Sequence, residues 1–496
     1  MRAFMGLDIG TSGVKAILID EQGRLKAAVT VGLSLSTPKP GWAEQHPDDW
    51  WKATVTATKQ VLKKSKVKAA QIGAIGLSGQ MHSSVFLDRT GKVVRPALLW
   101  CDGRTTAECR EITALVGEEH LREWVSNPAL EGFTLPKVLW LRRHEPAAFR
   151  RVDKVVLAKD YIRYRFTGEL TCEPSDASGT LMYDTAQRRW SRELMDAVGL
   201  PMSLLAELGG SAEVLGRVTP AMAKLTGLAT GTPVVGGGAD NACGAVGVGA
   251  VTVGEAVASW GTSGTVLAPM SEPKVDPQMR AHTFCHAVPD TWYMMGVMLT
   301  AGGAVAWHKR ELAKELDGRA NANLLLNQEA AEIPIGAEGL TFLPYLQGER
   351  TPHRDATARA AFVGLSLAHS RAHLSRAVFE GVCFGMMDSL AIIRTQAAPI
   401  SQILLTGGGA QSPFVRRMQA DVYGLPVVRV NREQGPAFGA ALLAAVGAGA
   451  FKSVAAACHA TLKRLPKERP DRKAHAAYQA SYERFKALYP ALKGLL

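Results

Sequence analysis

Three glycine-rich loops could hold phosphate groups: residues 10–13 (GTSG), 261–264 (GTSG) and 407–409 (GGG), each after a short apolar run. Glycine lets backbone N–H groups approach a phosphate closely, and the Thr and Ser hydroxyls add donors. A single loop of this kind is more often a simple tight turn. The presence of three such loops in one chain favours a site for nucleotide phosphates. The spacings match neither G-x-x-x-x-G-K-[ST] nor G-x-G-x-x-G, which disfavours P-loop and Rossmann folds.

Asp8 stands at the end of the first apolar run, directly before the first glycine loop. A carboxylate there can hold Mg²⁺, directly or through water, beside a phosphate that is being transferred. The aligned residue of the second GTSG copy is Ser259, so only one copy carries the charge, as a single metal–phosphate centre would require. A turn-forming Asp is the alternative, and spacing alone favours neither interpretation.

A second carboxylate, Asp240, is followed by Asn241 and preceded by a glycine run at the end of an apolar segment. Asp and Asn are favoured at helix N-caps, which is the simpler interpretation. The alternative is a catalytic base that orients a sugar hydroxyl and takes its proton during phosphoryl transfer. From the residues alone, the cap is favoured.

Gln80, Met81 and His82 lie on a predicted loop between two strands. Their amide, thioether and imidazole groups would suit one side of a polyol, with hydrogen bonds at the hydroxyls and apolar contact at the carbons. A single histidine is more often an ordinary core or surface residue, so His82 alone identifies no site.

The elements that must position these residues are predicted to form two related halves. The two GTSG copies lie 251 residues apart (261 − 10), and each is flanked by apolar runs that read as a hairpin. Alternating strands and helices predict an α/β fold, with the boundary between the halves near residues 245–255. The predicted strands include 4–9, 14–19, 25–33, 72–77, 85–87 and 403–405, and the predicted helices 48–64, 136–144, 374–393, 414–422 and 435–446.

Composition is that of an ordinary globular protein, with 496 residues, 47% hydrophobic and 21% charged. The net charge of +12 is scattered along the chain apart from a concentration at residues 463–473, so we expect no nucleic-acid partner. Two uncharged stretches, 291–308 and 434–451, are expected to be core segments rather than membrane spans.

Cysteine usage and the N-terminus predict a cytoplasmic protein. The seven cysteines form no C-x-x-C pair and are odd in number, which favours free thiols in a reducing compartment. Asp8 and Lys15 interrupt any apolar signal region. His282, Cys285 and His286 are close in sequence, but alternating strand residues explain them better than a metal site does.

Four segments together resemble the FGGY carbohydrate kinases, within the actin-like ATPase and sugar kinase superfamily: GLDIGTSG at 6–13, GFTLPKVLWLRRH at 132–144, AAFVGLSLAHSRAHLSRAVFE at 360–380 and GGGAQS at 407–412. The resemblance implies two ribonuclease H-like domains with a catalytic cleft between them. The first would be an N-terminal FGGY domain over 1–250 and the second an ATP-binding C-terminal domain over 251–450, followed by a basic helical tail over 451–496.

The same resemblance implies roles for individual residues. Asp240 would be the general base, which reverses the preference for a cap, and Asp8 the Mg²⁺ residue. Met81, His82, Asp240 and Asn241 would face the sugar. The residues that would line ATP are Thr11, Ser12, Lys15, Gly261, Thr262, Gly408, Gly409 and Ser412.

Within that family, the segments SGQMH at 78–82, PALLWCDGR at 96–104, ADNACGAVGVG at 239–249 and FLPYLQGERTPH at 342–353 are most similar to those of members that phosphorylate D-xylulose. Ser83 and Ala239 depart from the common pattern. Gluconate, L-fuculose and glycerol therefore stay open as substrates, as does a non-catalytic actin-like protein that binds nucleotide or sugar. The expected partners are the sugar and ATP, and the oligomeric state is left open, a homodimer included.

Overall fold

The computed structural model of the chain describes residues 2–495. Its first sheet has the strand order β13-β14-β5-β1-β2-β3, with the short β15 also paired to β5. These strands are β1 (Ala3–Ile9), β2 (Gly13–Asp20), β3 (Leu25–Gly32), β5 (Ile72–Gly79), β13 (Val214–Arg217), β14 (Pro233–Val235) and β15 (Gly238–Ala239). β1, β2 and β3 form an antiparallel meander, whereas β5 runs parallel to β1 and to β14.

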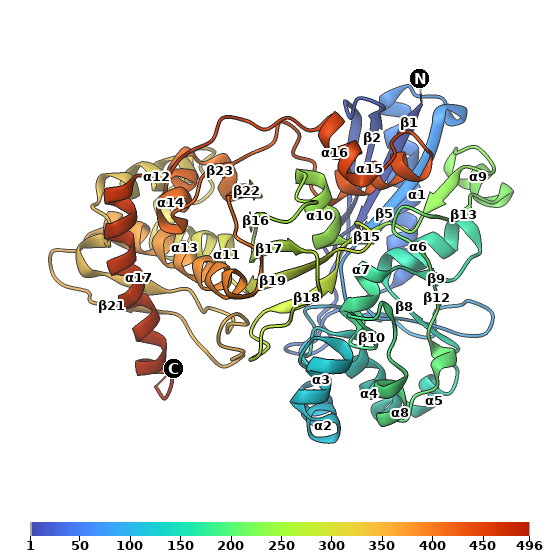
Figure 1. The fold of residues 1–496 in the computed structure, drawn as a ribbon, viewed down its shortest axis with the longest axis horizontal. Coiled ribbons are helices and arrows are strands. Elements are labelled where there is room, and N and C mark those ends of the chain that lie inside the picture. The colour runs from blue at the N-terminus through green and yellow to red at the C-terminus, as the bar shows by residue number, and fades with distance from the viewer. Residues whose placement is uncertain (1, 496) are drawn as a thin grey trace.

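The second sheet repeats that arrangement with the order β18-β19-β17-β16-β22-β23. Its strands are β16 (Glu255–Trp260), β17 (Gly264–Met270), β18 (His282–Cys285), β19 (Trp292–Met298), β22 (Gln402–Thr406) and β23 (Val427–Val428). β16, β17 and β19 form the corresponding antiparallel strands, with β18, which precedes β19 in the chain, paired on the outer side of β19. β22 pairs in parallel with both β16 and β23. The predicted duplication and the α/β fold are therefore confirmed (Figure 1).

Helices cover the faces of both sheets. The long helix α13 (Arg371–Gln396) packs against β19 and β17, and α1 (Pro47–Ser65) packs against β2 and β3. The sequence encodes the ends of α1, because Pro47 occupies its first turn with Asp48 and Asp49, and Lys63 and Lys64 occupy its last turn.

Smaller elements connect and surround the two sheets. In the first half they are β4 (Glu44–Gln45), β6 (Val85–Leu87), β7 (Ala97–Leu98), α2 (Thr106–Val116), α3 (Glu118–Val125), α4 (Thr134–His144), α5 (Pro146–Phe149), β8 (Lys154–Val156), α6 (Ala158–Thr167), β9 (Thr171–Cys172), α7 (Pro174–Ala177), β10 (Tyr183–Asp184), β11 (Arg189–Trp190), α8 (Arg192–Ala197), β12 (Glu207–Leu208), α9 (Pro220–Thr226) and α10 (Asp240–Val248). In the second half they are α11 (Gly302–Leu312), α12 (Ala322–Glu332), β20 (Thr341–Leu343), β21 (Ala361–Val363) and α14 (Pro413–Tyr423).

The chain crosses back from the second half to the first near its end. Helix α15 (Pro436–Gly447) lies on β1 and β5 and beside α10, and α16 (Val454–Thr461) packs on α15 (Figure 1). The approach is close, because a Cβ at Gly6 would lie 1.9 Å from the carbonyl oxygen of Ala437. Residues 436–461 therefore pack with the first half, although the expected ranges 251–450 and 451–496 placed them in the second domain and the tail.

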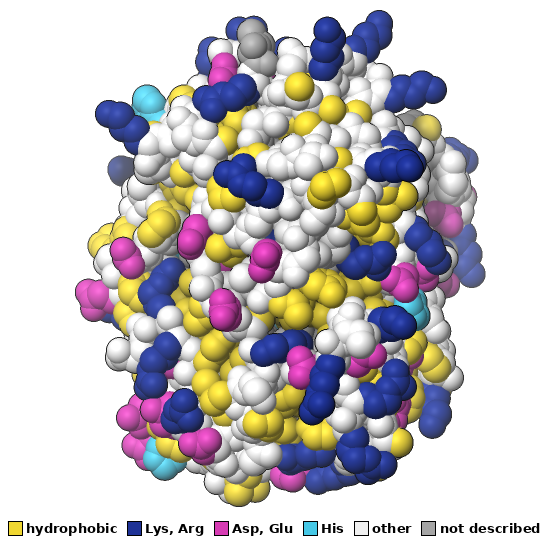
Figure 2. Space-filling view, turned by 90° about the vertical axis from the view of Figure 1, so that its right-hand side faces the viewer, with side chains coloured by type: hydrophobic (Ala, Val, Ile, Leu, Met, Phe, Trp, Pro, Cys, Tyr) yellow, Lys and Arg dark blue, Asp and Glu magenta, His cyan; other side chains and the backbone are white. Residues whose placement is uncertain are grey.

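The last helix, α17 (Arg472–Leu492), is the helical tail that the sequence predicted, and it is part of the second half. It buries Tyr478, Tyr482 and Phe485 against α13 and α14. The basic residues of the chain form no single patch on the face seen in Figure 2, where Lys and Arg side chains are interspersed with Asp and Glu.

The uncharged stretches 291–308 and 434–451 form β19 with the start of α11, and α15. Within residues 2–495, no helix combines the length and hydropathy needed to cross a bilayer. His282 and Cys285 lie on β18, and no group of three His, Cys, Asp or Glu side chains in the same range could hold a metal ion. The cysteines are all free.

Candidate active site

The carboxyl ends of three neighbouring parallel strands bring the candidate catalytic residues together. Asp8 on β1 lies opposite Ser78 on β5, and Ser78 lies opposite Gly238 on β15. The residues that follow, Gln80–His82 after β5 and Asp240 after β15, therefore meet Asp8 at one edge of the sheet. Such edges are the usual ligand sites of α/β proteins.

Asp240 is the first residue of α10, and Ala239 occupies the N-cap position without a capping side chain. Asp240 Oδ1 accepts hydrogen bonds from the backbone N–H of Asn241 (2.7 Å) and from its amide Nδ2 (2.9 Å). Its Oδ2 has no hydrogen-bond partner within residues 2–495, and the side chain lines a cavity. Burial, and then the charge of Asp8, raise the pKa of Asp240 to about 7. This geometry fits a base better than a cap.

Asp8 is also perturbed by its surroundings. Burial raises the pKa of Asp8 to about 6, although Ser78 and the Lys15 charge act in the opposite direction. Lys15 faces Asp8 across the hairpin, but its ammonium donates to the carbonyl of Gln434 (2.9 Å). A desolvated carboxylate that a neighbouring lysine compensates only in part is suited to a divalent cation.

His82 is held in one protonation state. Its Nδ1 donates to the backbone carbonyl of Gly179, and burial lowers the pKa of His82 to about 3. The neutral ring therefore presents Nε2 as a hydrogen-bond acceptor, which a sugar hydroxyl can use. Beside it, Met81 Sδ accepts a hydrogen bond from the side-chain amide of Asn241 (3.7 Å). This bond connects the residues after β5 to those after β15.

These side chains line a cavity of about 210 Å³ that both halves form. The first half supplies Met81, His82, Trp100, Asp240 and Asn241, and the second half supplies Ser259, Gly261, Ser263, Thr265, Met295, Val297 and Arg350. All four predicted sugar residues are present. Trp100 and Arg350 were not singled out from the sequence, although both belong to segments, 96–104 and 342–353, that resemble the xylulose-phosphorylating group.

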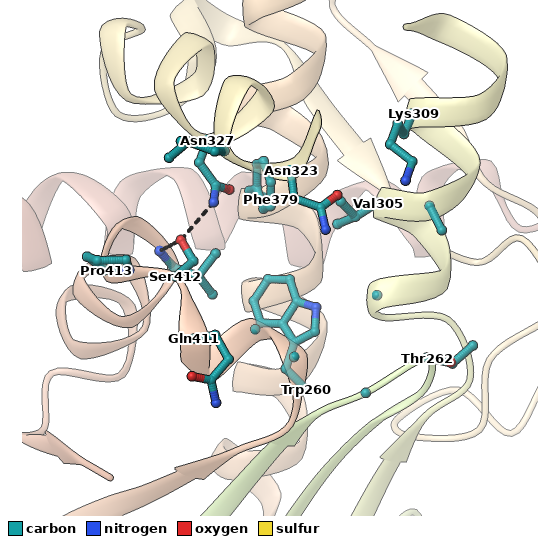
Figure 3. A pocket seen from close by; sticks show the side chains of 17 residues that line it. Trp260, Thr262, Val305, Lys309, Asn323, Asn327, Phe379, Gln411, Ser412 and Pro413 are labelled. Atoms are coloured by element: carbon teal, nitrogen blue, oxygen red, sulfur yellow. Dashed lines mark hydrogen bonds between the residues drawn. The ribbon is translucent and has the colours of Figure 1, made fainter. Parts of the chain in front are cut away.

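A larger cavity of about 640 Å³ lies within the second half (Figure 3). It contains five of the residues predicted to contact ATP: Gly261, Thr262, Gly408, Gly409 and Ser412. Its size and its mixture of apolar and polar side chains suit a nucleoside.

The walls of this larger cavity come from α11, α12, α13, α14 and the glycine loops. Ser412 caps α14 by accepting from the N–H of Val415 (3.2 Å) and accepts from the Asn327 amide (2.9 Å), so its hydroxyl is already engaged (Figure 3). A side chain at 409 is excluded, because a Cβ there would come within 2.5 Å of the Trp260 ring. Gly261 lines both cavities, which places the two sites next to each other.

Three other predicted ATP residues line neither of these cavities. The Thr11 hydroxyl donates to Gln80 Oε1 (2.9 Å) and accepts from Trp100 Nε1 (2.9 Å), so it connects the first glycine loop to the sugar side. Ser12 is exposed, and Lys15 is bound to Gln434.

A buried hydrogen-bond network supports β15, the strand that directly precedes Asp240. Ser175 Oγ accepts from the N–H of Ala239 (3.0 Å) and donates to Glu173 Oε1 (2.8 Å). Ser211 donates to the other oxygen of Glu173 (2.7 Å), and the Lys159 ammonium lies 3.4 Å from Oε1. All of these side chains are buried, so the network fixes the backbone directly before the base.

Comparison with known proteins agrees with this geometry. The chain matches the models of the N-terminal domain (residues 3–247) and the C-terminal domain (residues 256–448) of the FGGY family of carbohydrate kinases. A xylulose kinase from Escherichia coli strain K12 is 41% identical over 99% of this chain and 100% of its own length.

Solved structures give the same result. A protein from Brucella ovis described as a xyloylose kinase has a TM-score of 0.92 at 37% identity, with complete coverage of both chains. A gluconate kinase from Lactobacillus acidophilus has a TM-score of 0.92 at 26% identity and covers 99% of this chain and 98% of its own. The two family models together span nearly the whole chain, and we conclude that the chain belongs to the FGGY family of carbohydrate kinases.

Proposed function

We propose that the chain transfers the γ-phosphoryl group of ATP to the C5 hydroxyl of D-xylulose, giving D-xylulose 5-phosphate. One observation carries the proposal. The free oxygen of Asp240 belongs to a sugar-sized cavity that shares Gly261 with a nucleoside-sized cavity. A hydroxyl held at Asp240 would therefore lie where the phosphate end of a nucleotide could reach it.

Asp240 would accept the proton of the C5 hydroxyl as that oxygen attacks the γ-phosphorus in line. Its raised pKa, about 7, makes it a stronger base than an ordinary carboxylate while leaving much of it ionised near neutral pH. The backbone N–H groups of the glycine loops would donate to the phosphoryl oxygens, where negative charge is present throughout the transfer.

Asp8 would hold Mg²⁺, directly or through water. The ion, bound mainly by the phosphates, would supply positive charge at the transferring group. Of the two equivalent hairpin positions, only Asp8 is a carboxylate, since the position in the second half is Ser259. Lys15, bound to Gln434, would orient Asp8 rather than contact the nucleotide.

The xylulose kinase relatives support D-xylulose over other acceptors, and the Lactobacillus gluconate kinase makes gluconate the principal alternative. The direct test is ADP release with Mg·ATP over D-xylulose, gluconate, L-fuculose and glycerol. D-Xylulose should give the highest kcat/KM. A higher value for another acceptor would replace the substrate, and activity on none would favour a non-catalytic binding protein.

A further inference from the structure

Arg350 reaches into the sugar cavity from the second half, and the known chemistry of phosphoryl transfer does not account for it. The residue follows β20, and its guanidinium lies against the first half, where a Cβ at Gly132 would come within 3.3 Å of Nη2. Within residues 2–495 the guanidinium makes no hydrogen bond and no ion pair. A half-buried cation without a partner favours a ligand that supplies acceptor oxygens.

The backbone that carries Arg350 is firmly held. Thr351 exchanges two hydrogen bonds with Val297 on β19, from its N–H to the Val297 carbonyl and from the Val297 N–H to its hydroxyl (3.0 Å each). Glu349 Oε1 accepts from the N–H of Leu299 (3.0 Å) and from that of Arg350 (2.8 Å). A fixed backbone with a free head group is the arrangement expected of a substrate-contacting side chain.

The positive charge lies toward the His82 end of the cavity. The Nη2 atom of Arg350 lies beside Gly132, and the carbonyls of Gly132 and His82 both accept from the Lys137 ammonium (2.6 and 3.0 Å). In agreement with this position, the Arg350 charge contributes to the lowered pKa of His82. Asp240 faces the hydroxyl that receives the phosphoryl group. Arg350 therefore faces the part of the sugar farthest from the reacting oxygen.

We propose that Arg350 is a specificity residue that donates hydrogen bonds to the oxygens at C1 and C2 of the sugar. The inference rests on the proposed function for the identity of the reacting end. A planar guanidinium fits a pair of oxygens, and it fits a carboxylate best. The C2 carbonyl oxygen of a ketose has its acceptor lone pairs in the plane of the carbonyl and can face the guanidinium, whereas the C2 hydroxyl of a polyol has no such planar acceptor. The site should therefore prefer a ketose to the corresponding polyol, and it should also bind a five-carbon aldonate.

The test compares the wild type with Arg350→Met, which keeps the length of the side chain but removes its charge and donors. We expect kcat/KM for D-xylulose to fall roughly 10- to 100-fold, because a hydrogen bond to a charged group is lost. The loss for xylitol should be less than about threefold, and the KM for ATP should be unchanged. Arg354→Met is the matched control, since Arg354 belongs to the same loop and pairs with Glu118 (3.1 Å) away from both cavities.

Titration calorimetry with D-xylonate, which keeps the C3 and C4 configuration of D-xylulose, gives a measurement that does not need turnover. The wild type should bind D-xylonate, Arg350→Met should bind it more than about tenfold more weakly, and Arg350→Lys should retain part of the affinity. The inference would be overturned if Arg350→Met lowered kcat/KM equally for D-xylulose and xylitol. It would also be overturned if the substitution left the affinity for D-xylonate unchanged. A wild type that binds D-xylonate through Arg350 but does not phosphorylate D-xylulose would overturn the proposed function alone.

Discussion

The two GTSG hairpins occupy equivalent places in the two sheets but carry different chemistry. In β1–β2, Asp8 faces Lys15; at the corresponding place in β16–β17, Ser259 faces Thr265. The first turn is closed by a bond from Gly10 N–H to the Gly13 carbonyl, and the second, one residue tighter, by a bond from Gly261 N–H to the Ser263 carbonyl.

The surroundings of the hairpins differ as well. The first loop is bonded to Gln80 and Trp100 through Thr11. In the second loop, Gly261 is exposed at both cavities and Thr262 at the larger one. In the proposed mechanism, the same backbone would serve catalysis in one half and ligand binding in the other. The difference lies in a few side chains, which is why the fold alone does not specify the activity.

The largest effect is expected from replacing Asp240, the proposed general base, which lies in the first half. Asp240→Asn keeps the size of the side chain but cannot accept a proton, so kcat should fall about 10²- to 10⁴-fold. The KM for ATP should barely change, because Asp240 does not line the nucleotide cavity. Steady-state ADP release measures both quantities, and near-normal kcat would return Asp240 to a structural role at the start of α10.

The next largest effect tests the asymmetry of the hairpins directly. Asp8→Ala should lower kcat about 10- to 100-fold and weaken the dependence of the rate on Mg²⁺, with D-xylulose binding largely intact. Ser259→Ala is the matched variant of the second hairpin and should leave the Mg²⁺ dependence unchanged. If both variants respond to Mg²⁺ as the wild type does, the two hairpins do not differ in the way proposed.

The raised pKa of Asp240 predicts that kcat/KM falls at acidic pH, which gives the pH profile an acid limb. Below about pH 7, Asp240 becomes protonated and cannot act as a base, so kcat/KM should fall about tenfold for each further pH unit. Because the negative charge of Asp8 contributes to this pKa, Asp8→Asn should move the limb to lower pH. A limb near pH 4 in the wild type would mean that Asp240 is not desolvated, or that it is not the base.

A smaller effect is expected from the network behind Asp240. Ser175→Ala removes the acceptor of the Ala239 N–H and a donor to Glu173, which should lower kcat by several-fold and stability by about 1–3 kcal/mol. Ser453→Ala removes a capping hydroxyl from α16 at a residue that lines neither cavity, at a cost of about 1 kcal/mol. Thermal unfolding and kcat are measured for both variants. If Ser175→Ala lowers kcat no more than Ser453→Ala does for the same loss of stability, Ser175 has no positioning role.

Much of the fold followed from the sequence because its signals are local. Glycine turns between apolar runs located both hairpins, whereas the assignment of Met81, His82 and Asp240 to one sugar site came from the family resemblance. The return of residues 436–461 to the first sheet could not be predicted, because close packing of α15 on Gly6 depends on the tertiary structure.

The hydrogen-bond partners of individual side chains could not be predicted from the sequence either. Thr11 and Lys15 remain predicted ATP residues, and their hydrogen bonds to Gln80, Trp100 and Gln434 were not predicted. Arg350 was missed because it reaches the sugar cavity only across the boundary between the halves.

The central claim is that Asp240 of the first half and the glycine loops of the second direct a phosphoryl group to the C5 hydroxyl of D-xylulose. Phosphorus NMR of the reaction with Mg·ATP tests it most directly. With D-xylulose labelled with carbon-13 at C5, the product signal should be split into a triplet by the two protons on C5 and split further by the labelled carbon, which a 1-phosphate would not show. Inorganic phosphate should remain a minor species, and Asp240→Asn should form this product only slowly. Inorganic phosphate as the main product, or a phosphate ester on another carbon, would contradict the account.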